Sequence, residues 1–355
     1  MTRSRRHFLQ DVGLAGIGIS FAGALAGCSH KGAAHTLNLY TWDTYIGKHT
    51  LADFERAIGG HVNISLYANN DELFARLRDG NPGYDVIVPS NDCLERLHAA
   101  GMLSPIDHAK VPNLANIEPR FMNPPFDPGR QVSVPYTWIV TGIGYRKSKV
   151  DGVPDSWKWV LDSDRYKGRI GLLAEASELF EISAKYLGLP ANTADPATIA
   201  RIEAMLIRQK PNVALFHDDN GQDLLLAGDI DLVIEYNGDI AQVMREDKDI
   251  DFVVPREGGI IASDSLCIPK GAPNPELAHQ FINFVLDAKN GAHISETIRY
   301  PTPNHAALAL MPADYRDNPV IFPSEAVLKT CEYSKFRGQA VQTAYEQAMT
   351  RVRAG

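Results

Sequence analysis

Strand-like and helix-like segments alternate along most of this chain, and that alternation limits the folds it can adopt. The first helical pattern is amphipathic and is closed by Gly59 and Gly60. In this first block we predict strands at 36–40, 62–67 and 85–88 and helices at 51–58, 72–78 and 93–100. Such alternation is typical of a doubly wound α/β fold, in which helices flank a mainly parallel sheet.

A second α/β block starts near Gly168. Its patterns predict strands at 169–173, 213–216, 232–234 and 252–254 and helices at 178–187, 197–209, 222–227 and 240–246. A Pro-rich stretch at 123–129 and the run 138–145 lie between the two blocks, which places a domain boundary near residue 140. With 355 residues and 45% hydrophobic side chains, the chain is long enough for two packed cores.

The carboxyl ends of the predicted strands carry aromatic and acidic residues. In an open parallel sheet, ligands bind beyond those ends, where the strand order switches direction. This rule selects Trp42, Asp43, Tyr45, Ser90, Asp92, Glu175, Glu178, Tyr236 and Asp239. Taken singly, an acid at a helix start is often only an N-cap, and Trp42 or Tyr45 could be a core aromatic. Taken together, with no Arg or Lys among them, they predict a groove for a cation.

A polyamine fits such a groove, because it is a methylene chain that carries several ammonium groups. Carboxylates bind the ammonium groups through charge-assisted hydrogen bonds, and aromatic faces cover the methylenes and attract the charge. The formal net charge of −8 becomes −10 once residues 1–27, with three Arg and one Asp, are removed. That balance argues against nucleic acid as a partner.

No catalytic or cofactor motif is present in the sequence. GxSxG, HExxH, a P-loop and a dinucleotide GxGxxG are all missing, so we predict a protein that is not an enzyme, has no catalytic residues and needs no cofactor. The His217-Asp218-Asp219 segment is interpreted as a polar turn, and the eleven His show no pairing at metal-ligand spacing. We therefore predict no metal site.

The N-terminus has the features of an export signal. Residues 4–10 resemble a twin-arginine signal, and an apolar run follows at 12–26 that is too short and Gly-rich for a comfortable membrane span. Residues 25–28 resemble a lipobox, in which Cys28 is acylated and becomes the first mature residue. We therefore predict a signal peptide at 1–27 and a tether at 28–35; an uncleaved anchor or a fortuitous Arg pair are the alternatives.

Three other cysteines remain, Cys93, Cys267 and Cys331, and none has CxxC spacing. Buried free thiols are the expected state, with a single disulfide as the alternative.

Several segments resemble the periplasmic spermidine/putrescine-binding proteins, and the likeness extends from Leu37 to Gly355. They lie at residues 40–45, 84–90, 134–138, 257–260, 264–266 and 300–304. The resemblance implies a two-lobe periplasmic-binding-protein fold of type II, with a ligand cleft between two α/β lobes. It further implies an N-terminal lobe at 36–139 plus 262–303 and a C-terminal lobe at 143–259 plus 308–355, joined by crossovers near 140 and 260.

The resemblance also implies roles for individual residues. Trp42 and Tyr45 would wall the ligand with Ser90 nearby, and Glu175 and Glu178 would hold ammonium groups. Tyr236 stands where the family usually has Trp, Asp239 matches an acid of putrescine-type members, Asp264 matches a central ammonium-binding Asp, and Tyr300 would close the groove. The family acts as periplasmic monomers that deliver ligand to an inner-membrane ABC permease.

Four positions depart from the family pattern and bear on selectivity. Ala262 replaces an aromatic, Thr44 replaces an acid, Asp92 stands where an aromatic or small residue is usual, and Ser334 replaces a Gln. A wider and more acidic groove favours spermidine or spermine over putrescine. Two alternatives stay open: a binder of another cationic solute, such as agmatine, a basic amino acid or an opine, and a receptor that reports ligand to a membrane sensor.

Overall fold

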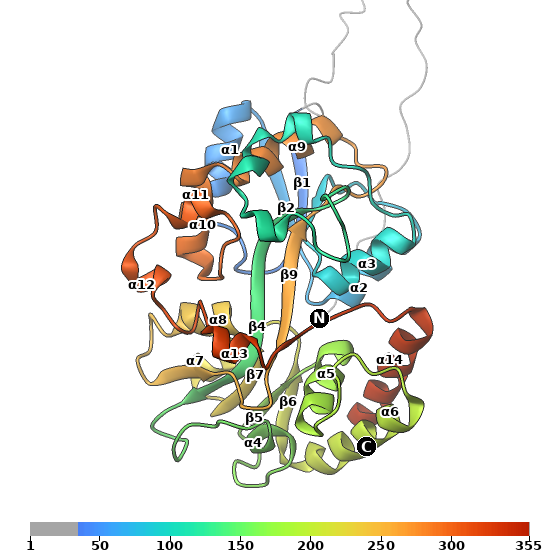
Figure 1. Ribbon diagram of the computed structural model, residues 1–355, viewed down its shortest axis with the longest axis vertical. Coiled ribbons are helices and arrows are strands. Elements are labelled where there is room, and N and C mark those ends of the chain that lie inside the picture. Colours follow the sequence, from blue (N-terminus) through green and yellow to red (C-terminus); the bar gives the residue numbers. More distant parts are fainter. Residues whose placement is uncertain (1–34, 355) are drawn as a thin grey trace, which may run out of the picture.

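Two α/β lobes, one above the other in Figure 1, are joined by long strands that run between them. The computed structural model describes residues 35–354. The predicted signal peptide at 1–27, Cys28 and most of the tether lie outside these residues. Within residues 35–354, no helix is both long enough and apolar enough to cross a membrane.

The first lobe is built on a three-stranded parallel sheet with the order β2-β1-β3. Its strands are β1 (Thr36–Thr41), β2 (His61–Leu66) and β3 (Val86–Ile87). Its helices are α1 (Thr50–Ile58), α2 (Asn70–Arg78), α3 (Asn91–Ala99), α9 (Pro275–Val285), α10 (Ala288–Ile298) and α11 (His305–Leu308). Leu37 and Leu39 of β1 pack with Phe54 and Phe281 in the lobe's core, so one face of the sheet is sealed by helices.

The second lobe is built on parallel strands β6, β5 and β7, in that order. Its strands are β5 (Ile170–Leu173), β6 (Val213–His217), β7 (Leu232–Tyr236) and β8 (Ile250–Val253). Its helices are α4 (Lys158–Leu161), α5 (Ala176–Tyr186), α6 (Pro196–Gln209), α7 (Gly221–Ala227), α8 (Asn237–Val243) and α14 (Gln339–Ala354). Trp157, Phe180 and Tyr345 are fully buried in its core.

Strand β4 (Val134–Arg146) passes from one lobe into the other. Residues 134–140 pair antiparallel with β9 (Ile260–Leu266), and residues 141–146 pair antiparallel with β7 and β8. A short third strand, β10 (Glu332–Tyr333), pairs parallel with β9. The sequence placed residues 138–145 between two blocks, and the structure shows that they belong to this single strand. Because β4 is buried on both faces, its sequence lacks the alternation that marks a half-exposed strand.

The predicted α/β fold is confirmed, and the predicted helix ends differ from the observed ones by only a few residues. The antiparallel pairing of β4 was not predicted, since it depends on contacts between segments far apart in the chain. The exact lobe ranges given above stay a prediction. Cys93 and Cys267 are buried, Cys331 is half-buried, and none of these three is in a disulfide.

Candidate functional site

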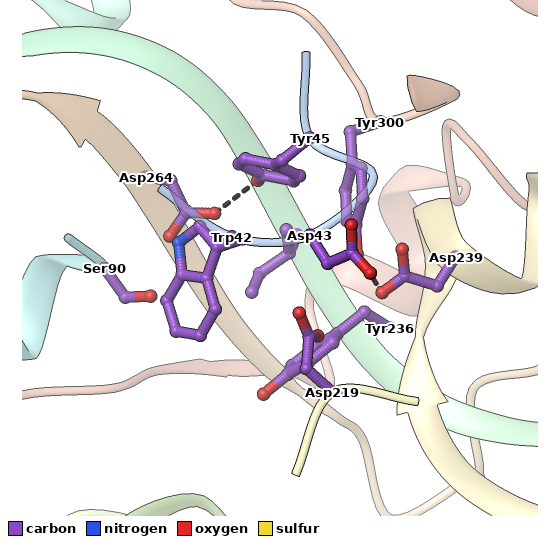
Figure 2. A pocket seen from close by; sticks show the side chains of 10 residues that line it. Trp42, Asp43, Tyr45, Ser90, Asp219, Tyr236, Asp239, Asp264 and Tyr300 are labelled. Carbon is purple, nitrogen blue, oxygen red and sulfur yellow. Dashed lines mark hydrogen bonds between the residues drawn. The ribbon is translucent and has the colours of Figure 1, made fainter. Parts of the chain in front are cut away.

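A pocket lies where the two lobes meet, beside the long strands β4 and β9 (Figure 2). We call it the first pocket, and it is lined by Trp42, Asp43, Tyr45, Ser90, Ile139, Asp219, Tyr236, Asp239, Asp264 and Tyr300. Tyr45, Asp239, Asp264 and Tyr300 are each only 3–4% exposed. The side chains therefore form an enclosed site rather than an open surface.

A second pocket adjoins the first and shares Ser90 and Ile139 with it. Its lining residues are Asn70, Ser90, Asp92, Ile139, Glu175, Ser177, Glu178, Ile260, Ala262 and Ser334. All eleven residues predicted from the sequence line one pocket or the other. Their role in binding a ligand stays a prediction at this point.

Strand ends explain why these residues meet. Strand β1 ends at Thr41, just before Trp42, and β7 ends at Tyr236, the residue that precedes α8. Glu175 follows β5 and is the N-cap residue of α5, while Ser90 is the N-cap residue of α3. In parallel sheets, the carboxyl ends of the strands gather on one edge, where side chains of successive loops converge.

Tyrosine hydroxyls hold three of the carboxylates in place. Tyr45 donates to Asp264, Tyr300 donates to Asp239, and the Tyr236 hydroxyl donates to Glu178 Oε2 at 2.7 Å. Each of these bonds occupies one carboxylate oxygen. The second oxygens of Asp264 (Oδ1) and Glu178 (Oε1) are buried and have no partner among residues 35–354. Two acceptors are thus left for a ligand.

Trp42 presents a fixed aromatic surface. Its indole N–H donates to the Val88 carbonyl at 2.8 Å, and the centroid of its ring lies 4.5 Å from the ring centroid of Tyr67. Tyr45 packs edge-on against both Tyr136 and Tyr300. The aromatic walls are therefore anchored by their neighbours and need little rearrangement to receive a ligand.

Burial raises the pKa values of several carboxyl groups in the two pockets, among them Asp239, Asp264, Glu175 and Glu178. The pKa of Asp264 rises to about 6, although the Tyr45 hydrogen bond acts against the rise. Burial raises the pKa of Asp239 to about 7 and that of Glu178 to about 8. Burial also raises the pKa of Glu175 well above its usual range, and the neighbouring acids Asp71 and Asp92 add to the rise. A bound cation would reverse these shifts, since an opposite charge favours the ionised form.

Among the residues that the structure describes, no Lys, Arg or His lines either pocket. Within residues 35–354, no group of three or more His, Cys, Asp or Glu is placed to hold a metal ion. The carboxylates are therefore not arranged to coordinate a metal ion, and their distribution over two adjoining pockets suits an extended organic cation.

Contacts between the lobes close the site. The Asn69 side chain donates to Asp218 Oδ1 at 3.2 Å, and the Asn70 backbone N–H donates to Glu175 Oε2 at 3.3 Å. Gly238 packs against the Tyr300 ring so closely that a Cβ atom there would lie 2.3 Å from it. Because these contacts join residues of different lobes, they would be broken if the lobes moved apart.

Asp219 was missed by the sequence analysis, which interpreted residues 217–219 as a polar turn. The structure places Asp219 in the lining of the first pocket, while His217 is buried with its Nδ1 3.7 Å from Glu235 Oε2. The sequence did contain a signal for Asp219, since this residue closely follows the predicted strand 213–216. Asp43 and Asp239 were selected because they follow predicted strands in the same way. Thr137, whose hydroxyl contacts that of Tyr45, was also missed because it lies inside β4.

The chain is similar to known proteins over most of its length. Residues 50–323 match the family described as bacterial extracellular solute-binding protein. The chain is 34% identical over 343 residues to the spermidine/putrescine-binding periplasmic protein of Escherichia coli, covering 94% of this chain and 97% of that one. It is 31% identical over 342 residues to a putrescine/cadaverine-binding protein of Pseudomonas aeruginosa, covering 93% and 96%.

A solved structure shares the fold. The crystal structure of a lipoprotein of Treponema pallidum superposes with a TM-score of 0.78 and is 28% identical, covering 90% of this chain and all of that one. This likeness confirms the expected two-lobe binding-protein fold.

Proposed function

The chain belongs to the bacterial extracellular solute-binding protein family, and we propose that it captures a polyamine in the periplasm for an ABC importer. Family membership confirms the prediction that the protein is not an enzyme. Relatives from E. coli and P. aeruginosa are named for binding spermidine, putrescine or cadaverine, which supports a polyamine as the ligand here.

One observation carries the proposal: two adjoining pockets are lined by acids, and no basic side chain of residues 35–354 lines them. Asp43, Asp219, Asp239 and Asp264 line the first pocket, and Asp92, Glu175 and Glu178 line the second. A basic amino acid or an opine also carries a carboxylate, which would need a basic partner. A ligand with ammonium groups alone matches the charge of both pockets.

The same pockets support a preference for longer polyamines. Asp92, Ala262 and Ser334, three of the positions that depart from the family pattern, all line the second pocket. Small side chains at 262 and 334 leave room there, and Asp92 adds a carboxylate beside Glu175 and Glu178. We infer that spermidine or spermine extends from the first pocket into the second, whereas putrescine carries only two ammonium groups and satisfies fewer of the acids.

Thermal unfolding tests both ligand class and preference. A soluble form beginning after Cys28 is heated with putrescine, cadaverine, spermidine, spermine, agmatine, lysine or arginine. A ligand at about 100 times its Kd adds about 2.7 kcal/mol of stability, which is a readily measured rise in Tm. We expect spermidine or spermine to give the largest shift and titration to show putrescine binding more weakly.

Two results would contradict the proposal in different ways. If lysine or arginine raises Tm and no polyamine does, the ligand class is wrong. If putrescine binds at least about tenfold more tightly than spermidine, a difference of about 1.4 kcal/mol, only the preference is wrong.

We further propose that the protein is exported by the twin-arginine route, anchored by a lipid on Cys28, and positioned to deliver ligand to an inner-membrane permease. The order of signal, apolar run and lipobox supports this, as does the similar fold of a protein described as a lipoprotein. Cells supplied with labelled palmitate should label the wild-type protein and not the Cys28→Ser variant. Equal labelling of both would remove the lipid anchor from the proposal.

A further inference from the structure

Asp219 sits with two other acids on one side of the first pocket. Figure 2 shows Asp43, Asp219 and Asp239 on this side, with Trp42, Ser90 and Asp264 on the other. Asp43 follows β1 in the first lobe, whereas Asp219 and Asp239 follow β6 and β7 in the second. The three acids therefore come together only when the lobes are closed.

The three carboxylates differ in how they are already bonded. Asp43 Oδ1 accepts from the Thr44 backbone N–H at 2.8 Å, and Asp239 accepts from the Tyr300 hydroxyl and from Gln242 Nε2 at 3.2 Å. No hydrogen bond within residues 35–354 ends on the Asp219 carboxylate. It does not cap the following helix either, since α7 has Asn220 at its N-cap.

Burial is the main reason that the pKa of Asp219 lies well above its usual range, and Asp239, Asp43 and Asp264 raise it further. The neighbouring charges that act most strongly on Asp219 are thus acidic. Across the same pocket, Asp264 is only 3% exposed, and its Oδ1 has no hydrogen-bond partner in the described part of the chain. The first pocket therefore holds a buried, unpaired acceptor, and no positively charged side chain of residues 35–354 lines it.

A primary alkyl ammonium group, as at the ends of a polyamine, has three N–H donors and carries a full charge. An N-acetylated amine has one N–H donor and no charge. Three carboxylates from both lobes suit an ammonium group, because each carboxylate can accept one of the three N–H hydrogen bonds. They do not suit an N-acetylated amine, which has a single N–H and no charge. A neutral acetamide would leave the acids unpaired in a buried site, which is costly.

We propose that Asp219 is a ligand-binding and specificity-determining residue that, with Asp43 and Asp239, selects polyamines with a free terminal ammonium over acetylated ones. The inference rests on the proposed function, since it names a feature of the same ligand site. It adds a residue that neither the strand-end rule as applied to the sequence nor the family resemblance had assigned.

The test compares the affinities of two proteins for two ligands, so that the effect of the substitution can be separated for each ligand. Wild type and Asp219→Asn are titrated with spermidine and with N1,N8-diacetylspermidine, whose two ends are both blocked, so the orientation of the ligand does not matter. Asp229→Asn is the matched control, because it removes the same charge from an exposed position of the same lobe. The melting temperature of each ligand-free variant reports folding.

We expect Asp219→Asn to weaken spermidine binding about tenfold, as the loss of a hydrogen bond to a charged group predicts, and Asp229→Asn to change it little. Diacetylspermidine should bind the wild-type protein weakly, and the Asp219→Asn substitution should cause little further loss of diacetylspermidine binding. The preference for spermidine would then fall about tenfold in this variant alone.

Equal losses for both ligands, or a loss no larger than that of Asp229→Asn, would overturn the inference and leave the proposed function intact. If wild type binds no polyamine at all, the proposed function itself fails. Asp219→Asn should also melt no lower than wild type without ligand, since it removes repulsion among acids; a clearly lower Tm would mark Asp219 as structural and count against the inference.

Discussion

Replacing Asp264 with asparagine should weaken spermidine binding by about 2 kcal/mol or more, which is about thirtyfold in Kd. Asp264 is almost fully buried, and its Oδ1 has no hydrogen-bond partner among the described residues. Asparagine keeps the shape and an oxygen for the Tyr45 hydroxyl, but it removes the charge that an ammonium group would pair with in a site shielded from water. Isothermal titration with spermidine measures the loss.

Glu178→Gln offers an independent test in the second pocket. The Oε2 atom of Glu178 accepts from Tyr236, and its Oε1 has no partner within residues 35–354. Because Asp264 has the same arrangement, we expect a loss of similar size. Asp229→Asn serves as the exposed control. Unchanged affinity in both Asp264→Asn and Glu178→Gln would remove these two acids from the binding site.

Raising the pH should destabilise the ligand-free protein and strengthen ligand binding. Burial raises the pKa of Asp239 to about 7 and that of Glu178 to about 8, whereas unfolded carboxyl groups titrate near about 4. Between these values the folded state binds more protons than the unfolded state, so the free energy of unfolding falls as pH rises. From about pH 6.5 to about pH 8.5 the ligand-free Tm should therefore decrease.

Spermidine reverses this trend, because its amines stay charged in that range and ionised carboxylates bind them. Affinity should rise with pH, and binding near pH 7 should release protons, which calorimetry in buffers of different ionisation enthalpy detects. Below about pH 6.5 the buried His217, whose pKa burial lowers to about 4, acts in the opposite direction, so that range is not diagnostic. A ligand-free Tm that rises between pH 6.5 and 8.5, or an affinity independent of pH, would contradict the account.

Local patterns in the sequence were sufficient to find many of the residues that line the two pockets. The strands that end at Thr41, Leu173 and Tyr236 have clear apolar patterns, and the residues after them line the pockets. The rule needed only strand positions and parallel direction. It needed no knowledge of how the two lobes are placed.

Features that depend on contacts between segments far apart in the chain could not be predicted from local sequence patterns. The 13-residue strand β4 is buried in both lobes and shows no period-two pattern, so its pairing with β9, β7 and β8 could not be inferred. The division of the acids into two pockets also depends on packing, since Ser90 and Ile139 come from different elements and meet only in the folded chain.

Asp264 and Tyr300 show what the family resemblance added. Asp264 lies within β9 and Tyr300 follows α10, so neither stands at the end of a parallel strand. The resemblance assigned both to the groove, and the structure places both in the first pocket. Asp219 is the opposite case, because it follows a parallel strand and meets the strand-end rule. It was left out because residues 217–219 were interpreted as a polar turn.

A crystal structure of the protein with spermidine tests the central claim most directly. We expect one ligand that runs from the first pocket into the second, with one ammonium group at Asp264 Oδ1 and the methylenes against Trp42 and Tyr45. Ligand density elsewhere on the protein, or an empty cleft at saturating spermidine, would contradict it.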